Sequence, residues 1–367
     1  MSKSNVAAAQ KLLDFPSAEP RVPARQATRP VCVGVIGYGY WGPNLVRNFS
    51  RAADCEMAAV ADRDAGQLKR MSEEFPGISG TTDYGRLLSD PDIEAVAIAT
   101  PVASHFPIAS AALRAGKHVL LEKPLATSVR EAERLVAIAA KHDRLLMVDH
   151  TYLFTGAVET MRRLVAAGEL GEILYFDSTR INLGLFQRDV NVIWDLAPHD
   201  LSILLHVLDK KPVAVSALGA AHAGTGLENL AYMTLTFDDN TLAHFHVNWL
   251  APRKVRQIII GGVKKMLVFD DMESNEKVKI YDKGITVEQS DREAVYNTLI
   301  QYRVGDMWAP RIDATEALYK ECAYFSKCIR GGKRPFNDGV AGLNVVRVLE
   351  ASTESIRNSG QLVPIIY

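Results

Sequence analysis

Between residues 31 and 150, short and continuously apolar segments alternate with segments of helical periodicity. Strands that are apolar throughout are typical of a parallel sheet with helices on both faces. The alternation predicts a doubly wound α/β domain. The expected strands are Val31–Ile36, Met57–Ala61, Ala95–Ala99, Val119–Leu121 and Leu145–Val148, and the expected helices are Pro43–Arg51, Ala65–Phe75, Phe106–Ala115 and Ser128–Lys141.

After His150 the pattern changes to longer segments in which apolar and polar residues alternate, with turn sequences between them. Alternation with a period of two favours an antiparallel or mixed sheet. We expect strands near Ile173–Arg180, Ala231–Phe237, Leu242–Trp249, Val255–Ile260 and Lys277–Tyr281, and helices at Val158–Ala167, Thr315–Arg330 and Gly339–Ser359. The chain is therefore predicted to hold two α/β domains, residues 31–150 and 151–367.

Residues 1–30 differ from the rest, because they contain four prolines and little periodicity. We expect a flexible N-terminal extension, in which residues Asn5–Phe15 could form a short helix.

Composition excludes several classes of protein. The 42 Lys and Arg nearly balance the 43 Asp and Glu, so the basic excess of a nucleic-acid-binding protein is absent. The four cysteines lack the spacing of a zinc site or a disulfide framework. No apolar segment approaches the ~20 residues of a membrane span. We expect a cytoplasmic protein that binds neither nucleic acid nor membrane.

A glycine-rich motif follows the first expected strand and precedes the first expected helix. It comprises Gly37, Tyr38, Gly39, Tyr40, Trp41 and Gly42. In a Gly-x-Gly-x-x-Gly turn the first glycine permits the tight turn, the second lets a pyrophosphate approach the backbone, and the third permits close helix packing. The helix N-terminus then offers its free N–H groups to the phosphates. This arrangement predicts a dinucleotide site in a Rossmann domain.

Asp62 follows the second expected strand, twenty residues after Gly42. Its carboxylate can accept hydrogen bonds from the adenosine ribose and would repel the additional phosphate of NADP, so NAD is favoured. Arg63 beside it leaves NADP possible, because a guanidinium can pair with that phosphate or stack on adenine.

Two more motifs follow the third and fourth expected strands. The first contains Thr100, Pro101 and His105, and the second is Glu122-Lys123-Pro124. Ligands of open α/β sheets bind at the carboxyl edge of the strands, so we assign Thr100, Pro101, His105, Glu122 and Lys123 to the cofactor site. A cis bond before Pro124 is possible.

The sequence Asp195-Leu-Ala-Pro198-His199 predicts a second set of reacting groups. A proline is tolerated in the first turn of a helix, so we expect a helix to begin near Pro198. Asp195 would then lie at the helix entry and orient the His199 imidazole. Oxidation of a secondary alcohol needs an acceptor for the hydroxyl proton, which a histidine supplies near neutral pH. Lys123 can hydrogen-bond the same oxygen and stabilise its developing charge.

Taken together, the glycine motif, Glu122-Lys123-Pro124 and Asp195-x-x-x-His199 resemble the glucose–fructose oxidoreductase/inositol dehydrogenase/rhizopine-catabolism (Gfo/Idh/MocA) family. The resemblance extends from about Val31 to Tyr367. It implies an N-terminal Rossmann domain, and a C-terminal α/β domain with a large open sheet that often serves as an oligomer interface. It also implies an NAD(P)-dependent oxidoreductase acting on sugars, polyols or nucleotide-linked sugars. Lys123 matches the family lysine, and Asp195 and His199 match the substrate-side pair.

Two stretches depart from the family pattern. Many members carry Asn-Arg-Arg-Phe where this chain has Thr151-Tyr152-Leu153-Phe154, and glycines where it has Asn191-Val-Ile-Trp194. We therefore place Tyr152 and Trp194 in the substrate site, where either ring could stack on a sugar or a nucleobase or pack in the core. Arg180 and Asn182 are further candidates, for holding a carboxylate or phosphate.

His244, His246 and Asn248 alternate along one strand face, but no third metal ligand is evident, so we expect no metal site. The predicted function is an NAD-dependent dehydrogenase of a sugar or nucleotide-sugar, in a dimer or tetramer. Two alternatives stay open. One is a redox-assisted glycoside hydrolase of the same family, and the other is a dinucleotide-sensing regulator without turnover.

Overall fold

The computed structural model describes residues 29–184, 190–222, 224, 226–287 and 300–367. The predictions for residues 1–28, including the helix at Asn5–Phe15, lie outside this set. Residues 31–367 form one compact unit. All elements described below belong to it.

The first sheet is parallel and has the strand order β3-β2-β1-β4-β5-β6. This order confirms the predicted Rossmann topology. The strands are β1 (Val31–Ile36), β2 (Cys55–Ala61), β3 (Ser79–Thr81), β4 (Ala95–Ile98), β5 (His118–Glu122) and β6 (Leu146–Asp149). The helices are α2 (Gly42–Arg51), α3 (Ala65–Glu74), α4 (Gly85–Ser89), η1 (Val102–Ser104), α5 (His105–Arg114) and α6 (Val129–Lys141).

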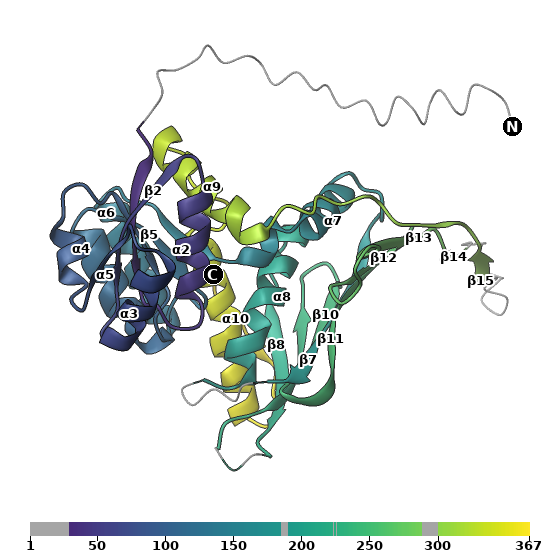
Figure 1. Ribbon diagram of the computed structural model, residues 1–367. Helices are drawn as coiled ribbons and strands as arrows, with labels where there is room; N and C mark the ends of the chain where they lie inside the picture. The colour runs from purple at the N-terminus through teal and green to yellow at the C-terminus, as the bar shows by residue number, and fades with distance from the viewer. Residues whose placement is uncertain (1–28, 185–189, 223, 225, 288–299) are drawn as a thin grey trace, which may run out of the picture. The chain divides into compact units, whose positions relative to one another are not determined.

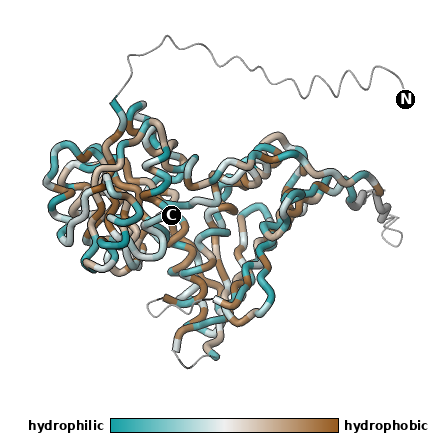
Figure 2. Tube along the Cα trace, in the orientation of Figure 1, coloured by the Kyte–Doolittle hydropathy of each residue, from teal (hydrophilic) through white to brown (hydrophobic). Residues whose placement is uncertain are grey.

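Both faces of this sheet are buried, which explains its continuously apolar strands. In β1, Val33 and Val35 belong to one hydrophobic cluster, whereas Cys32 and Ile36 belong to a second. Figure 1 shows the helices around the strands, and Figure 2 shows brown, hydrophobic segments gathered at the strands. The short β3 and α4 were not predicted, because their few residues carry too little apolar periodicity.

The second sheet is mixed and has the order β16-β13-β12-β11-β7-β10-β9-β8-β17. Of its neighbouring strands, β7 and β10 run parallel, and the other pairs run antiparallel. Its strands are β7 (Ile173–Leu183), β8 (Ala214–Ala220), β9 (Leu230–Thr236), β10 (Leu242–Asn248), β11 (Leu250–Gly262), β12 (Met266–Asp270), β13 (Val278–Tyr281), β16 (Met307–Trp308) and β17 (Val363–Pro364). A separate hairpin pairs β14 (Gly284–Val287) with β15 (Ile300–Arg303). The predicted α/β class with a large mixed second sheet is confirmed.

The remaining helices are η2 (Thr151–Phe154), α7 (Gly156–Ala166), α8 (Val192–Leu208), α9 (Ala317–Gly331) and α10 (Gly339–Arg357). Helices α8 and α10 lie along the second sheet (Figure 1). On the other face of that sheet Leu218, Tyr232 and Leu242 are exposed. Helix α9 packs against α2, although it is distant in sequence. The predicted domain boundaries at residues 30/31 and 150/151 stay predictions.

Candidate active site

The glycine motif forms a turn between β1 and α2. At two positions of this turn only glycine fits. Gly37 has φ +98°, and a Cβ there would lie 2.6 Å from the Ala99 carbonyl oxygen. A Cβ at Gly42 would lie 2.1 Å from the Gly37 carbonyl oxygen. At Gly39 a Cβ would meet nothing within 4 Å. No side chain caps the N-terminus of α2. The turn therefore offers open space at Gly39 beside a helix N-terminus without a side-chain cap, which suits a bound pyrophosphate.

Asp62 lies at the end of β2 and is fixed against this turn. One carboxylate oxygen accepts a hydrogen bond from the backbone N–H of Tyr38 at 2.6 Å, and the other accepts one from Asp64 at 2.8 Å. Arg63 is exposed. These positions fit the predicted contact between Asp62 and an adenosine ribose.

The three aromatic residues of the turn lie in different environments. Tyr38 is fully buried and donates its hydroxyl to Glu74, so only its backbone faces the turn. Burial raises the pKa of Tyr38 to about 12. Tyr40 is exposed. The Trp41 indole donates a hydrogen bond to Asp149 at 2.8 Å. The Tyr38 side chain therefore packs in the core, and the predicted contact of this residue with the cofactor would come from its backbone.

His105 joins two loops of the cofactor edge. Its ring nitrogens lie 2.9 Å from the carbonyl oxygens of Pro124 and Thr100, and the side chain is buried. Burial lowers its pKa. Both nitrogens face protein carbonyls, so His105 holds the two loops of the cofactor edge together, and its contact with a cofactor stays a prediction. The Thr100 hydroxyl accepts a hydrogen bond from Ser104, and Pro101 is exposed beside it.

Lys123 follows β5, in a turn with a cis Lys123–Pro124 bond. Its ammonium donates to the backbone oxygen of Asp195 at 2.8 Å and lies 3.3 Å from the Asp195 carboxylate. The other carboxylate oxygen of Asp195 accepts a hydrogen bond from the Trp249 indole at 3.1 Å. The carboxyl edge of the first sheet thus meets the helix that carries the second predicted motif.

That helix begins earlier than expected, so the predicted start near Pro198 is wrong. Helix α8 begins at Val192, and the Asn191 side chain caps it by accepting the Trp194 N–H at 3.1 Å. Pro198 lies inside the helix, which continues past it despite the missing N–H donor. As a result Asp195 and His199 both belong to α8 and lie one turn apart on the same face.

His199 is half-buried among cationic and aromatic side chains. Its ring centroid lies 5.1 Å from that of Tyr152, and its Nδ1 has no hydrogen-bond partner within the described residues. Burial is the largest cause of a pKa well below the ordinary value of 6.5, followed by the positive charges of Lys123 and Arg180. The imidazole is thus neutral at neutral pH, the form that accepts a proton. The expected contact from Asp195 to His199 is replaced, because the carboxylate bonds Lys123 and Trp249.

Arg180 is buried, and its guanidinium is occupied by Asp200. Two of its nitrogens lie 2.9 and 2.6 Å from the Asp200 carboxylate, and a third donates to the Tyr152 hydroxyl at 3.2 Å. The charge of Arg180 is thus already paired within the protein, which weakens the case for a substrate carboxylate or phosphate there, and its role in substrate binding stays a prediction. Asn182 lies two residues farther along the same face of β7.

Arg256 on β11 belongs to the same cluster, although we did not predict it. Its guanidinium donates to the Tyr152 hydroxyl at 2.6 Å and lies 3.4 Å from Asp271. Neither Arg256 nor Trp249 belongs to a local motif, and only strand pairing brings them to the site.

The Trp194 indole N–H donates to Thr353 at 2.9 Å, and its ring packs against both hydrophobic clusters. This contact matches the core-packing alternative for Trp194.

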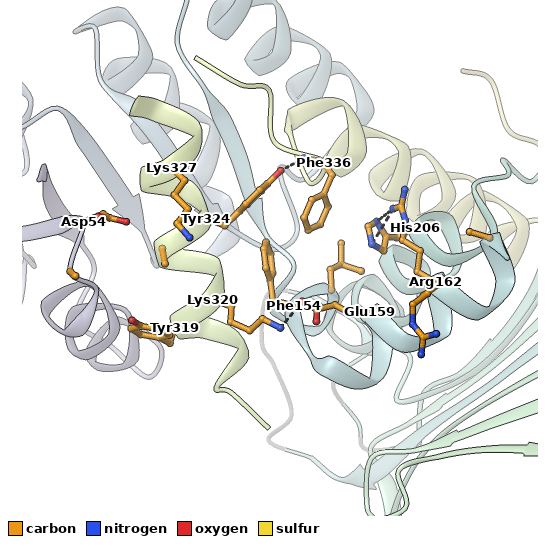
Figure 3. A pocket seen from close by; sticks show the side chains of 15 residues that line it. Asp54, Phe154, Glu159, Arg162, His206, Tyr319, Lys320, Tyr324, Lys327 and Phe336 are labelled. Atoms are coloured by element: carbon orange, nitrogen blue, oxygen red, sulfur yellow. Dashed lines mark hydrogen bonds and ion pairs between the residues drawn. The ribbon is translucent and has the colours of Figure 1, made fainter. Parts of the chain in front are cut away.

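A separate cavity lies between η2, α7 and α9. It has a volume of about 690 Å³. Figure 3 shows Phe154, Tyr324 and Phe336 facing one another, with Arg162 and Lys327 around them. None of the predicted site residues lines it. The candidate site therefore rests on its contacts and not on the size of a cavity.

His244 and His246 lie on the open face of the second sheet, where both stack on Tyr232. Within the described parts of the chain, no group of three or more His, Cys, Asp or Glu side chains could hold a metal ion. None of the described helices is both long and apolar enough to span a bilayer.

Comparison with known families decides the identity of the fold. Residues 31–150 match the model described as "Oxidoreductase family, NAD-binding Rossmann fold", and residues 158–268 match the GFO/IDH/MocA C-terminal domain. The chain belongs to the Gfo/Idh/MocA oxidoreductase family. The predicted resemblance is confirmed, and so is the NAD-binding Rossmann domain. The open space at Gly39, the uncapped α2 and the carboxylate of Asp62 fit an NAD molecule at the carboxyl edge of the first sheet.

Three relatives illustrate the match. A UDP-N-acetylglucosamine 3-dehydrogenase of Acidithiobacillus ferrooxidans is 29% identical, over 85% of this chain and 93% of that protein. A solved structure of a UDP-N-acetylglucosamine 3-dehydrogenase from the same organism has a TM-score of 0.76 at 25% identity, and covers 90% of this chain and 99% of its own. An uncharacterized oxidoreductase of Bacillus subtilis is 29% identical, over 59% of this chain and 66% of that protein. This last match thus spans slightly less than two thirds of the relative.

Proposed function

We propose that this protein is an NAD-dependent dehydrogenase that oxidises a ring hydroxyl of a sugar or nucleotide-sugar to a ketone, or catalyses the reverse reduction. One observation carries the proposal. Lys123, at the carboxyl edge of the NAD-binding sheet, hydrogen-bonds Asp195, one helical turn before His199 on α8. A cation and a neutral imidazole are thereby held together where a nicotinamide would bind.

Each group has a role that its surroundings support. NAD, when bound, supplies the acceptor for the hydride. The His199 imidazole accepts the proton of the reacting hydroxyl, because its lowered pKa keeps the ring unprotonated before the reaction. The Lys123 ammonium donates a hydrogen bond to the same oxygen and stabilises its developing negative charge. Asp195 holds Lys123 in place through its carboxylate and its backbone oxygen.

The substrate class follows from the residues around His199 and from the relatives. Tyr152 and Arg256 offer a ring and a guanidinium beside the imidazole, and both suit a sugar hydroxyl or a phosphate. The relative matched over 93% of its length is named for a nucleotide-sugar. We propose NAD rather than NADP, because the fixed Asp62 carboxylate would repel an additional phosphate.

The test is a panel of free sugars, UDP-sugars and dTDP-sugars, assayed for NADH formation with the wild-type protein and two variants. We expect NADH from at least one sugar. His199→Asn should lower kcat by about 10²–10⁴-fold, because the proton acceptor is lost, while the Kd for NADH stays the same. His142→Asn, just after α6, is the matched control and should keep wild-type turnover.

Three other results would contradict the proposal. Full turnover in His199→Asn would remove the assigned role. Glycoside cleavage with retained NAD and no net NADH would favour the redox-assisted hydrolase. Bound NAD without turnover of any sugar would favour the dinucleotide-sensing regulator.

We also propose that the exposed face of the second sheet mediates a homo-oligomer. The exposed apolar residues Leu218, Tyr232 and Leu242 on that face support this proposal. The predicted cytoplasmic location stays a prediction.

A further inference from the structure

Three carboxyl groups from distant parts of the chain meet behind the candidate site. Glu122 and Asp149 end the paired strands β5 and β6, where they are register partners. Glu321 reaches them from α9. Asp149 and Glu321 are buried. Neighbouring buried carboxyl groups disfavour one another's ionised form, so protonation of some of them lowers the cost of burial.

The pKa values of the two glutamates are shifted in this direction. Burial, and then the charge of Asp149, raises the pKa of both Glu122 and Glu321 well above the ordinary value. One oxygen of Glu321 accepts a hydrogen bond from Asn337, but the other would be buried without a partner if the group were ionised. A protonated Glu321 instead donates a hydrogen bond to Asp149.

Asp149 also accepts hydrogen bonds from two residues that belong to the site. The Trp41 indole of the glycine turn donates to one of its oxygens at 2.8 Å, and the Thr151 hydroxyl donates to the other. Thr151 precedes Tyr152, whose ring contacts His199. The buried Asp149 side chain thus contacts the glycine turn through Trp41 and contacts Thr151, which precedes Tyr152. Its register partner Glu122 precedes Lys123.

We propose that Asp149 is a positioning residue that holds the glycine turn, the Lys123 turn and the Tyr152 segment in mutual register. It acts through Trp41, Thr151 and Glu122 and touches neither cofactor nor substrate. The proposal rests on NAD binding, which the family establishes. Only its kinetic readout rests on the proposed dehydrogenase activity.

A positioning role predicts changes in NADH binding and turnover, whereas a purely structural role predicts a change in thermal stability only. In Asp149→Asn the amide keeps the size of the side chain but loses the charge and one of the two acceptor oxygens. We expect the Kd for NADH to rise about tenfold and kcat to fall by a similar factor. Trp41→Phe should reproduce the change in the Kd for NADH. The double variant should be no worse than Asp149→Asn, because both substitutions break the same contact.

Glu321→Gln is the matched control. An amide donates a hydrogen bond as a protonated carboxyl does, so this variant should bind NADH like the wild type. NADH binding is measured by fluorescence titration without substrate, and thermal unfolding is recorded for every variant. If Asp149→Asn does not fold, Trp41→Phe alone still tests the proposal through its Kd for NADH.

Two results would overturn the proposal. One is a lowered Tm in Asp149→Asn or Trp41→Phe with unchanged NADH binding, which would leave Asp149 a purely structural role. The other is multiplicative effects in the double variant, which would show that the two residues act independently. A raised Kd for NADH in a protein that oxidises no sugar would sustain the positioning role and refute only the dehydrogenase proposal.

Discussion

The two halves of the candidate site are built in different ways. On the cofactor side, each group follows the end of a parallel strand directly, and backbone geometry at Gly37, Gly39 and Gly42 shapes the turn. On the substrate side, the groups come from η2, α8, β7 and β11 and are held by pairs such as Arg180–Asp200. The cofactor half is therefore local in sequence, whereas the substrate half depends on long-range packing.

The electrostatic surroundings of the two halves also differ. Asp62 brings a negative charge to the glycine turn. Around His199, burial and then the positive charges of Lys123 and Arg180 lower the pKa of the imidazole, and Arg256 adds a smaller effect. A carboxylate at one end suits ribose hydroxyls, and cations at the other suit an oxygen that gains negative charge during the reaction. The contrast implies that a substitution at Asp62 should act on dinucleotide binding, whereas a substitution at Lys123, which contacts α8, should also reach His199.

Asp62→Ala should weaken NADH binding, and among these substitutions it should have the largest effect. The ribose contact and the anchor of the Tyr38 N–H are both lost, so we expect the Kd for NADH to rise about tenfold or more. The Kd for NADPH should change less, because the repulsion of its additional phosphate is removed. Fluorescence titration with both dinucleotides gives the comparison.

The neighbouring Asp64→Ala is the control, since Asp64 caps α3 by accepting the Gly66 N–H. This variant should lower the Tm and leave the dinucleotide preference unchanged. Equal losses of NADH and NADPH binding in Asp62→Ala would remove the ribose role.

A smaller effect should appear in the titration of His199 in Lys123→Met. Removal of a positive neighbour makes protonation easier, so the pKa of His199 should rise. It should stay below 6.5, because burial remains the largest cause of the lowering. NMR titration of the imidazole measures the shift without any need for turnover.

His118 is the control in the same spectra. Its pKa is lowered to about 4, first by burial and then by Arg144, and Lys123 is not among the causes. Its titration should not move. An unchanged His199 midpoint would show that Lys123 does not act on the imidazole.

Much of the Rossmann domain and of the cofactor half of the site could be predicted from the sequence. The predicted strand Val31–Ile36 coincides with β1, and the other predicted strands of the first sheet agree within a few residues. The glycine turn, Asp62 and Lys123 were predictable because the carboxyl ends of parallel strands meet at one edge. Asp149 lies at that edge too, and the same rule could have indicated it.

The substrate half of the site could be predicted only in part. Pro198 misled the prediction of the helix start, because Asn191 provides an earlier cap and the helix tolerates the missing donor. Arg180 was assigned to a ligand because its partner Asp200 lies on another element. Arg256 carries no local signal, since only the pairing of β7 with β11 brings it to Tyr152. Long-range ion pairs are invisible to motif spacing.

The central claim is that the groups after β5 and within α8 act on one substrate oxygen. A crystal structure of the complex with NADH and a ketose or keto-sugar ligand tests it most directly. We predict the Lys123 ammonium and the His199 imidazole both within ~3 Å of the carbonyl oxygen beside the nicotinamide. A complex in which that oxygen contacts neither side chain would contradict the account.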